Sequence, residues 1–260
     1  VPWWIPVAGS IFAIAIGKMV FGGLGNNPVN PALLGRAFLM ASWPVHMTAD
    51  WGRTAFRSMS GLETIVRNTS QQVSDFISSA TPLAVAKTAR AEILDGGDQI
   101  YQLIFRELSS GEMLKNLFLG NVSGCIGEIS AIALLIGAIY LAFYHIIDWR
   151  IPTAYLGTVA VLSWIMGGGQ ELFTGQPLFH LLSGGLFLGA FFMATDMVTS
   201  PVTKKGRLWF GIGCGVLTVA IRLYGGYPEG VSYSILLMNL AVPLLDKLSP
   251  KKFGEVAKNA

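Results

Sequence analysis

Thr81 is the residue whose type and position most clearly suggest chemistry. Its hydroxyl comes directly before Pro82, inside the one long polar segment of an otherwise apolar chain. A Thr-Pro pair ahead of a run without Gly or Pro (83–93) is typical of a helix start, with Thr as the cap and Pro at the first helical position. A helix N-terminus offers unpaired N–H groups and the positive end of the helix dipole, so it could seat a phosphate group.

Four further polar residues lie in apolar surroundings and are candidates for ion coupling: Asp196, Glu128, Asn27 and Asn30. A carboxylate at the end of an apolar stretch is costly unless it is paired or hydrated. Asp196 belongs to a break, 195–201, whose hydroxyls and freed carbonyls could ligate Na⁺ with it. Structural alternatives remain open: Asp196 as an interfacial cap, Glu128 as an acid at a helix N-terminus, and both asparagines as turn formers.

The composition is that of a membrane protein. Of the 260 residues, 52% are hydrophobic and 13% charged, 31 are Gly, and the mean hydropathy is +0.55. The basic residues behind the net charge of +3 are dispersed or sit at helix ends, so we expect no nucleic-acid surface. Cys125 and Cys214 lie in separate apolar segments without metal-ligand spacing, so we expect no metal site.

The apolar runs predict an all-α polytopic bundle, with membrane helices over 5–24, 32–43, 129–147, 152–166, 181–194, 208–223 and 231–245. Gly- and Asn-rich runs interrupt the pattern at 22–31 and 120–128. Backbone groups freed by such breaks are tolerated in a membrane only where protein or a wet cavity surrounds them, and transporters place binding sites there. Residues 6–31 and 177–201 share a Pro-to-Pro pattern that predicts an internal repeat.

Four regions follow from these patterns: membrane helices over 1–47, a mostly helical polar loop over 48–112, membrane helices over 113–246, and a tail over 247–260. Arg150, the basic run 204–207 and the tail lysines fall on one side when the helices alternate in direction. The loops on the opposite side, 167–179 and 225–230, contain no Lys or Arg, and Glu229 in the second loop is expected to be solvated. The positive-inside rule predicts that the basic side is cytoplasmic and that the polar loop is extracytoplasmic.

The polar loop resembles a known flavin-attachment site. The run Asp75-x-x-Ser78-Ser79-Ala80-Thr81 is similar to the motif of the Rnf and Na⁺-pumping NADH:quinone oxidoreductase families, in which the last Thr carries FMN through a phosphoester. The resemblance implies that Thr81 is the covalent FMN site, which would make the chain a flavoprotein and a phosphoprotein.

Further signatures of the family cover most of the chain, at 22–32, 120–128, 149–152, 192–196, 227–231 and 237–240. Asn121, in the second of these, is a further candidate for cofactor binding. The run around Tyr227 and the short basic tail resemble the D subunit of the Rnf complex. The fold of this family is similar to urea-transporter-like helix bundles, and its members are longer, so we expect further membrane helices ahead of Val1.

The resemblance implies an electron-relay subunit of a translocase in a bacterial or archaeal cell membrane. Electrons would pass from reduced ferredoxin to NAD⁺, coupled to export of Na⁺ or H⁺, with the A, B, C, E and G subunits of Rnf as partners. It also allows a noncovalent riboflavin in the membrane bundle. Because the Thr81 hydroxyl has no paired base in the motif, a separate flavin transferase is implied.

Three alternatives are weighed against this interpretation: the B subunit of the Na⁺-pumping enzyme, a non-redox channel or transporter for a small solute, and a protein that only scaffolds its partners. The channel or transporter gives no reason for a long loop carrying the motif that ends at Thr81. Flavin fluorescence of the denatured chain would discriminate between them, because only a covalent flavin survives denaturation.

Overall fold

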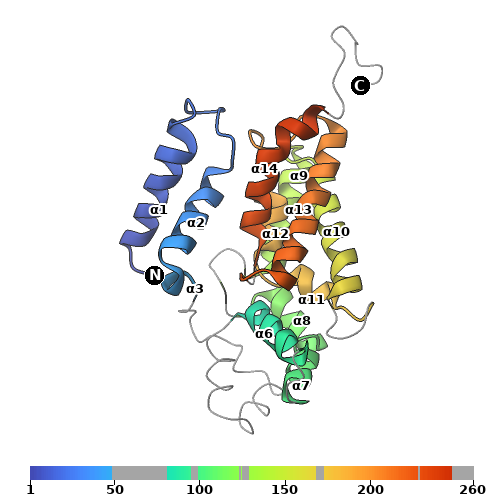
Figure 1. Ribbon diagram of the computed structural model, residues 1–260. Coiled ribbons are helices and arrows are strands. Elements are labelled where there is room, and N and C mark those ends of the chain that lie inside the picture. Colours follow the sequence, from blue (N-terminus) through green and yellow to red (C-terminus); the bar gives the residue numbers. More distant parts are fainter. Residues whose placement is uncertain are drawn as a thin grey trace.

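The computed structural model describes residues 1–48, 81–94, 99–122, 124, 129–167, 173–227 and 229–247, and the regular secondary structure of this part of the chain is entirely helical, without strands (Figure 1). The prediction of an all-α protein is therefore confirmed. Before the polar loop lie α1 (Trp4–Ile14), the π-helical turn η1 (Ala15–Met19), α2 (Pro31–Ser42) and α3 (Pro44–Thr48). The polar loop contributes α6 (Pro82–Leu94), α7 (Gln99–Glu107) and α8 (Gly111–Leu119).

Three long helices form the centre of the bundle: α10 (Arg150–Met166), α13 (Lys204–Tyr224) and α14 (Val231–Lys247). The most extensive helix pairing is between α10 and α13, followed by α13 with α14. Their shared core contains the fully buried side chains of Tyr155, Phe210 and Ile235. These helices match the predicted ones to within a few residues, because long apolar runs between polar ends fix helices well.

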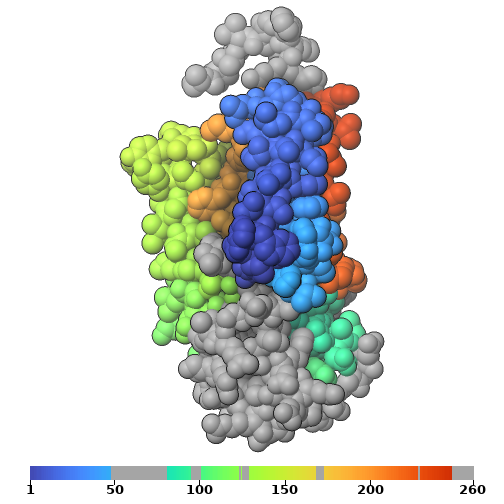
Figure 2. Space-filling model, turned by 90° about the vertical axis from the view of Figure 1, so that its left-hand side faces the viewer, coloured from blue at the N-terminus to red at the C-terminus, as the bar shows by residue number. Residues whose placement is uncertain are grey.

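The pair formed by α1 and α2 lies along one face of this centre, where α2 contacts α14. In Figure 2, which looks onto that face, α1 and α2 lie between α9 (Ala131–Phe143) on the left and α14 on the right. α2 runs unbroken from Pro31 to Ser42 and contains Arg36. The first predicted helix ends at Met19 and not at residue 24. Glycines with positive φ begin soon after this end, at Gly22.

The prediction of one continuous helix over 181–194 is wrong. The chain forms α11 (Pro177–Leu182), α12 (Leu186–Leu188) and the π-helical turn η3 (Gly189–Met193) instead. Gly184, between α11 and α12, has φ +68° and ends the first piece in the left-handed region that glycine tolerates. Each segment of the predicted repeat contains one π-helical turn, η1 in 6–31 and η3 in 177–201. The repeat itself stays a prediction.

The helix predicted over 129–147 is also shorter than expected. α9 has 13 residues, or about 20 Å of helix, against a hydrocarbon core of ~30 Å. Its end at Phe143 is followed by His145 with φ +55°, which a helix cannot contain. By length and composition, α13 alone among the described helices could cross a membrane unaided, whereas Trp4–Met19 and α9 are apolar but shorter.

The helices of the polar loop form a second core at the lower end of the bundle in Figure 1. Leu83 and Ala86 of α6 pack there with Ile104 of α7 and with Met113 and Leu117 of α8. α10 and α13 point their C-terminal ends toward this core. Their N-terminal ends, with Arg150 and Lys204, lie at the opposite end of the bundle.

Candidate functional site

Thr81 caps α6, as the sequence predicts. Its Oγ1 accepts a hydrogen bond from the Ala84 N–H at 3.3 Å, and its carbonyl accepts one from Val85 at 3.0 Å. Pro82 occupies the first helical position, where its missing N–H costs nothing. The side chain of Thr81 is half-buried, so its hydroxyl lies at the positive end of a 13-residue helix without being enclosed.

A small cavity of about 20 Å³ lies beside Thr81. Its walls come from three parts of the chain: Leu117 and Ile129 around the end of α8, Gly184 in the break between α11 and α12, and Glu229 before α14. About 10–15 Å³ is enough for a single water molecule. The cavity therefore cannot enclose a flavin ring, which would have to extend away from it.

Glu229 ties this region to α2. Its carboxylate forms an ion pair with Arg36, and both side chains are largely shielded from solvent. Its carbonyl accepts from Nε of Arg222, a buried residue near the end of α13. The sequence placed Glu229 in a solvated turn, and that interpretation is wrong, because Arg36 lies 193 positions away in the chain yet directly beside it.

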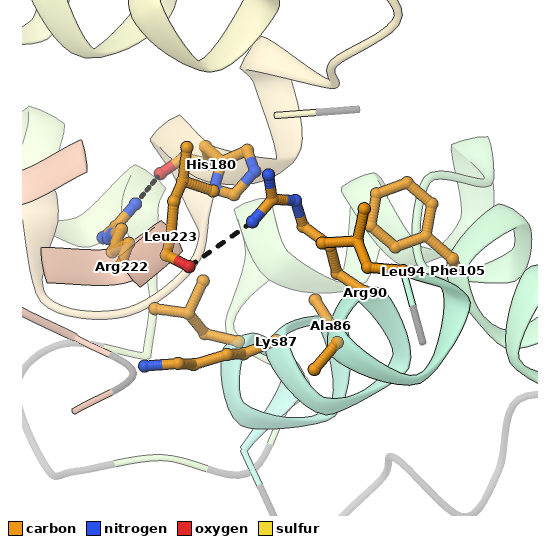
Figure 3. Close-up of a pocket in the computed structure, with 10 residues that line it drawn as sticks. Ala86, Lys87, Arg90, Leu94, Phe105, His180, Arg222 and Leu223 are labelled. Carbon is orange, nitrogen blue, oxygen red and sulfur yellow. Dashed lines mark hydrogen bonds between the residues drawn. The ribbon is translucent and has the colours of Figure 1, made fainter. Parts of the chain in front are cut away.

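A second cavity, of about 110 Å³, lies further along α6 (Figure 3), and Leu83 lines both cavities. Its cations point toward carbonyl groups at the ends of the bundle helices. Lys87 donates to the carbonyls of Gly225 and Tyr227, and Arg90 donates to those of Leu223 and Met166.

Arg222 completes this set by donating to the carbonyls of His180, at 2.6 Å, and Ser183, at 3.1 Å. Carbonyls at helix C-termini carry the negative end of the dipole and lack intrahelical donors. The cations therefore fasten α6 to the C-terminal ends of α10 and α13 and stabilise the end of α11. Burial lowers the pKa of Lys87, and its two carbonyl contacts offset part of the cost of burying the charge.

The asparagines of the first break act as turn and cap residues. Asn30 Oδ1 accepts from the N–H groups of Ala32 and Leu33 and so caps α2. Asn27 Nδ2 donates to the Val29 carbonyl at 3.2 Å. Asn30 also makes a tertiary contact, since its Nδ2 reaches the Met193 carbonyl at the end of η3, at 3.4 Å. The two broken helices therefore meet at Asn30.

Asn239 of α14 connects this contact to Asp196. With its amide oriented to satisfy its neighbours, Asn239 accepts from the Asn30 N–H at 3.1 Å and donates to the Thr199 carbonyl at 3.2 Å. Thr199 Oγ1 donates to the Asp196 carboxylate at 3.0 Å. We call these four residues the break network. The sequence indicated Asn30 and Asp196 as separate candidates, with Thr199 among the hydroxyls of the Asp196 break, but it assigned no role to Asn239, a polar residue inside an apolar segment.

Of the remaining predicted site residues, the structure describes only Asn121. Asn121 is exposed just after α8, where its N–H donates to the Asn116 carbonyl, and it is not among the residues lining the Thr81 cavity. Asp75, Ser78, Ser79, Ala80 and Glu128 lie outside the described residues.

Comparison with known proteins identifies the family. A sequence model described as the NQR2, RnfD, RnfE family matches residues 1–254. The chain belongs to this family. The family predicted from the motifs is therefore confirmed, and the D subunit is the member that the relatives name.

Three relatives within the NQR2, RnfD, RnfE family illustrate the similarity. The D subunit of the Na⁺-translocating ferredoxin:NAD⁺ oxidoreductase complex of Acetobacterium woodii is 48% identical over 259 residues, covering 99% of this chain and 68% of the relative. The D subunit of the proton-translocating ferredoxin:NAD⁺ oxidoreductase complex of Clostridium ljungdahlii is 47% identical, covering 98% and 70%. The D subunit of the ion-translocating oxidoreductase complex of Stutzerimonas stutzeri is 40% identical, covering 99% and 72%.

These relatives bear on the class of protein. All three are named as subunits of oxidoreductase complexes that translocate ions, so the prediction of an oxidoreductase subunit is confirmed. Ion translocation requires a membrane, which agrees with the apolar composition of this member of the NQR2, RnfD, RnfE family.

Proposed function

We propose that this chain is the membrane subunit that relays electrons within a complex coupling electron transfer from reduced ferredoxin to NAD⁺ with export of Na⁺ or H⁺, and that FMN is attached to Thr81 through a phosphoester. The observation that carries the proposal is the placement of the Thr81 hydroxyl at the N-terminus of α6, half-buried beside a cavity. The relatives' names support the reaction.

The residues around Thr81 fit a phosphoester. A phosphodiester carries a negative charge, which the N-terminus of α6 would stabilise through its free N–H groups and its dipole. Glu229, the acid in the cavity wall, is already neutralised by its ion pair with Arg36. FMN held there would supply reversible one- and two-electron transfer. The small cavity leaves no room for the ring, so the ring would project toward a partner protein or the aqueous surface.

The role of the protein would be to fix that flavin relative to the bundle. Lys87 and Arg90 anchor α6 to carbonyls at the ends of α13 and α10, so that Thr81 keeps a constant position. A constant position matters because the rate of electron transfer depends on the distance between the flavin and its redox partner. Within the described part of the chain, the Thr81 hydroxyl is bonded to a backbone N–H rather than to a base, which supports a separate flavin transferase.

Ion coupling would use the break network. Asn30, Asn239, Thr199 and Asp196 join the first broken helix, α14 and the segment after η3 through consecutive hydrogen bonds. Such a link between two interrupted helices is the type of element that can change arrangement during transport. We propose it as the place where the translocated ion is sensed.

In-gel flavin fluorescence tests the assignment of Thr81. We expect the denatured wild-type chain to fluoresce and Thr81→Ala to lose the signal completely while still assembling, since loss of a cap costs only about 1 kcal/mol. Thr88→Ala, on the same helix, is the matched control and should keep the fluorescence. A fluorescent Thr81→Ala band would disprove the attachment site.

A further inference from the structure

A large open pocket lies at the end of the bundle opposite the polar-loop helices. It has a volume of about 520 Å³ and lies between the connection that follows α9, the start of α10, the break after η3 and the start of α13. In Figure 1 the start of α10 and the start of α13 lie at the upper end of the bundle, whereas α6 lies at the lower end. The flavin site at Thr81 does not use this pocket, although Thr195, Met197 and Ser200 in its wall belong to the break that contains Asp196.

Two arginines supply the pocket with positive charge. Arg150 and Arg207 both donate to Oδ2 of Asp148, at 2.9 and 2.6 Å, and Arg207 Nε also donates to the Pro201 carbonyl at 2.9 Å. Two arginines and one aspartate leave one net positive charge in the wall. Asp148 holds the two guanidinium groups side by side, so their geometry is fixed before any ligand arrives.

Most of the arginine donors are still available for a ligand. A guanidinium has five N–H donors. Within the described part of the chain, the side chain of Arg150 uses one of them and that of Arg207 uses two. Their side chains are 29% and 31% exposed, and both line the open pocket. Paired guanidinium groups with free donors match the oxygens of a phosphate group.

The surroundings of the pocket are those of a membrane interface. Trp149, 65% exposed, lies beside the Arg150 guanidinium, which is 5.4 Å from its ring centroid. Tyr144, Met197 and Val202 are also exposed around this end of the bundle. Exposed aromatic side chains next to cations at the ends of apolar helices mark the headgroup level, and basic pockets between membrane helices there bind lipid headgroups.

We propose that this pocket binds the phosphodiester headgroup of an anionic phospholipid through Arg150 and Arg207. The acyl chains would run along the exposed apolar surface of α9, which includes Ile136, Ile139 and Phe143 and ends directly before the pocket. A lipid is favoured over a partner protein because the charged pocket opens between exposed apolar and aromatic side chains rather than within a polar surface. The proposal depends on a membrane location and not on the flavin.

Photolabelling of the purified complex tests the proposal. A phosphatidylglycerol with a photoreactive acyl chain should label this chain near α9, and a phosphatidylcholine analogue should label it at least tenfold less. Arg150→Gln and Arg207→Gln should each reduce the labelling about tenfold, the effect of losing one charge-assisted contact of about 1.4 kcal/mol. Lys205→Gln removes the same charge from an exposed residue of α13 and should change the labelling less than about twofold.

Asp148→Asn separates a binding role of the arginines from a purely structural one. The substitution keeps an amide oxygen that can still hold the two guanidinium groups side by side, but it removes the negative charge that competes with a ligand, so labelling should stay equal or increase even if the protein becomes less stable. Labelling that falls equally in Asp148→Asn and the arginine variants would overturn the proposal. So would complete competition by inorganic phosphate at the same concentration, which would indicate a free-phosphate site, or crosslinks from a partner protein into the pocket.

Discussion

At the scale of single residues, Asp196 is the acid best placed to report on ion coupling. Its carboxylate accepts from Thr199, whose carbonyl accepts from Asn239. Asp196→Asn keeps the size of the side chain but removes its charge. If the break network senses the ion, this variant should keep assembly and flavin content while transporting several-fold fewer ions per electron, measured in proteoliposomes with a defined electron donor.

Asp246 provides the control for this experiment. It lies at the same end of the bundle, where its carboxylate accepts from the N–H groups of Val202 and Thr203 ahead of α13. Asp246→Asn keeps an oxygen acceptor and should leave the transport stoichiometry unchanged. Equal stoichiometry in the wild type and in flavin-replete Asp196→Asn would reduce Asp196 to a structural residue that accepts from Thr199.

Asp148 should make stability depend on pH. Burial raises the pKa of its carboxyl, but hydrogen bonds from the Arg150 N–H and from the guanidinium groups of Arg207 and Arg150 lower the pKa by more, so it lies below its ordinary value. The stabilisation is therefore present above the unfolded-state pKa of about 4 and is lost as the pH falls through the folded-state pKa. Asp148→Asn should melt below the wild type at neutral pH, and this difference should vanish in acid. A difference that stays constant with pH would contradict the assignment.

At the scale of elements, the close approach of α13 to α10 depends on glycine. A Cβ on Gly211 would lie 2.7 Å from the Ile151 carbonyl oxygen and 2.8 Å from the Ala154 Cβ, and one on Gly215 would lie 2.6 Å from the Thr158 Cβ. These contacts belong to backbone or to short side chains that cannot rotate away. The Gly-x-x-x-Gly spacing that lets membrane helices approach each other is present on α13.

Gly211→Ala should therefore destabilise the protein, by roughly 1–3 kcal/mol or more, through overpacking. Gly157→Ala, on α10, is the matched control, because a Cβ there meets no atom within 4 Å. It should be neutral or stabilise by up to about 1 kcal/mol through helix propensity. Apparent melting temperatures in detergent would measure both. Equal melting temperatures for Gly211→Ala and Gly157→Ala would mean that the α10–α13 interface has room for a Cβ at position 211.

The same elements show which parts of the structure a sequence can predict. The helices α10, α13 and α14 follow from apolar runs, and the cap at Thr81 follows from its neighbour Pro82, because both signals are local. The break at Gly184 does carry a local signal, the run Ser183-Gly184-Gly185, although apolar residues surround it on both sides. The end of α9 carries no Gly or Pro, so no local pattern marks it.

The contacts that connect the site to the bundle could not be predicted for the same reason. Arg36 and Glu229 are 193 positions apart, and Asn30 and Met193 are 163 positions apart. Local sequence patterns identify single polar residues, but they do not show which of these residues contact each other in the fold. Asn30 and Asp196 stand out in the sequence because each is a polar residue in a break between apolar segments, but the link between them through Asn239 is tertiary.

At the scale of the whole molecule, the two ends of the bundle differ in kind. One end holds the polar-loop helices and Thr81, and the other holds Arg150, Lys204, Lys205 and Arg207 (Figure 1). The positive-inside rule then predicts that the second end faces the cytoplasm and that α7 lies outside. The side of the membrane on which Thr81 lies is also the side on which a flavin transferase must act.

Cysteine labelling in intact cells tests this orientation. In a background in which Cys125 and Cys214 are replaced by Ser, Gln102→Cys places a thiol on an exposed position of α7, and Lys205→Cys places one on an exposed position at the start of α13. A membrane-impermeant maleimide should label position 102 in intact cells and position 205 only after the membrane is permeabilised. Because both positions are exposed, a difference in labelling reports the side of the membrane and not burial. The opposite pattern would reverse the orientation, put Thr81 in the cytoplasm, and require that FMN be attached to it there.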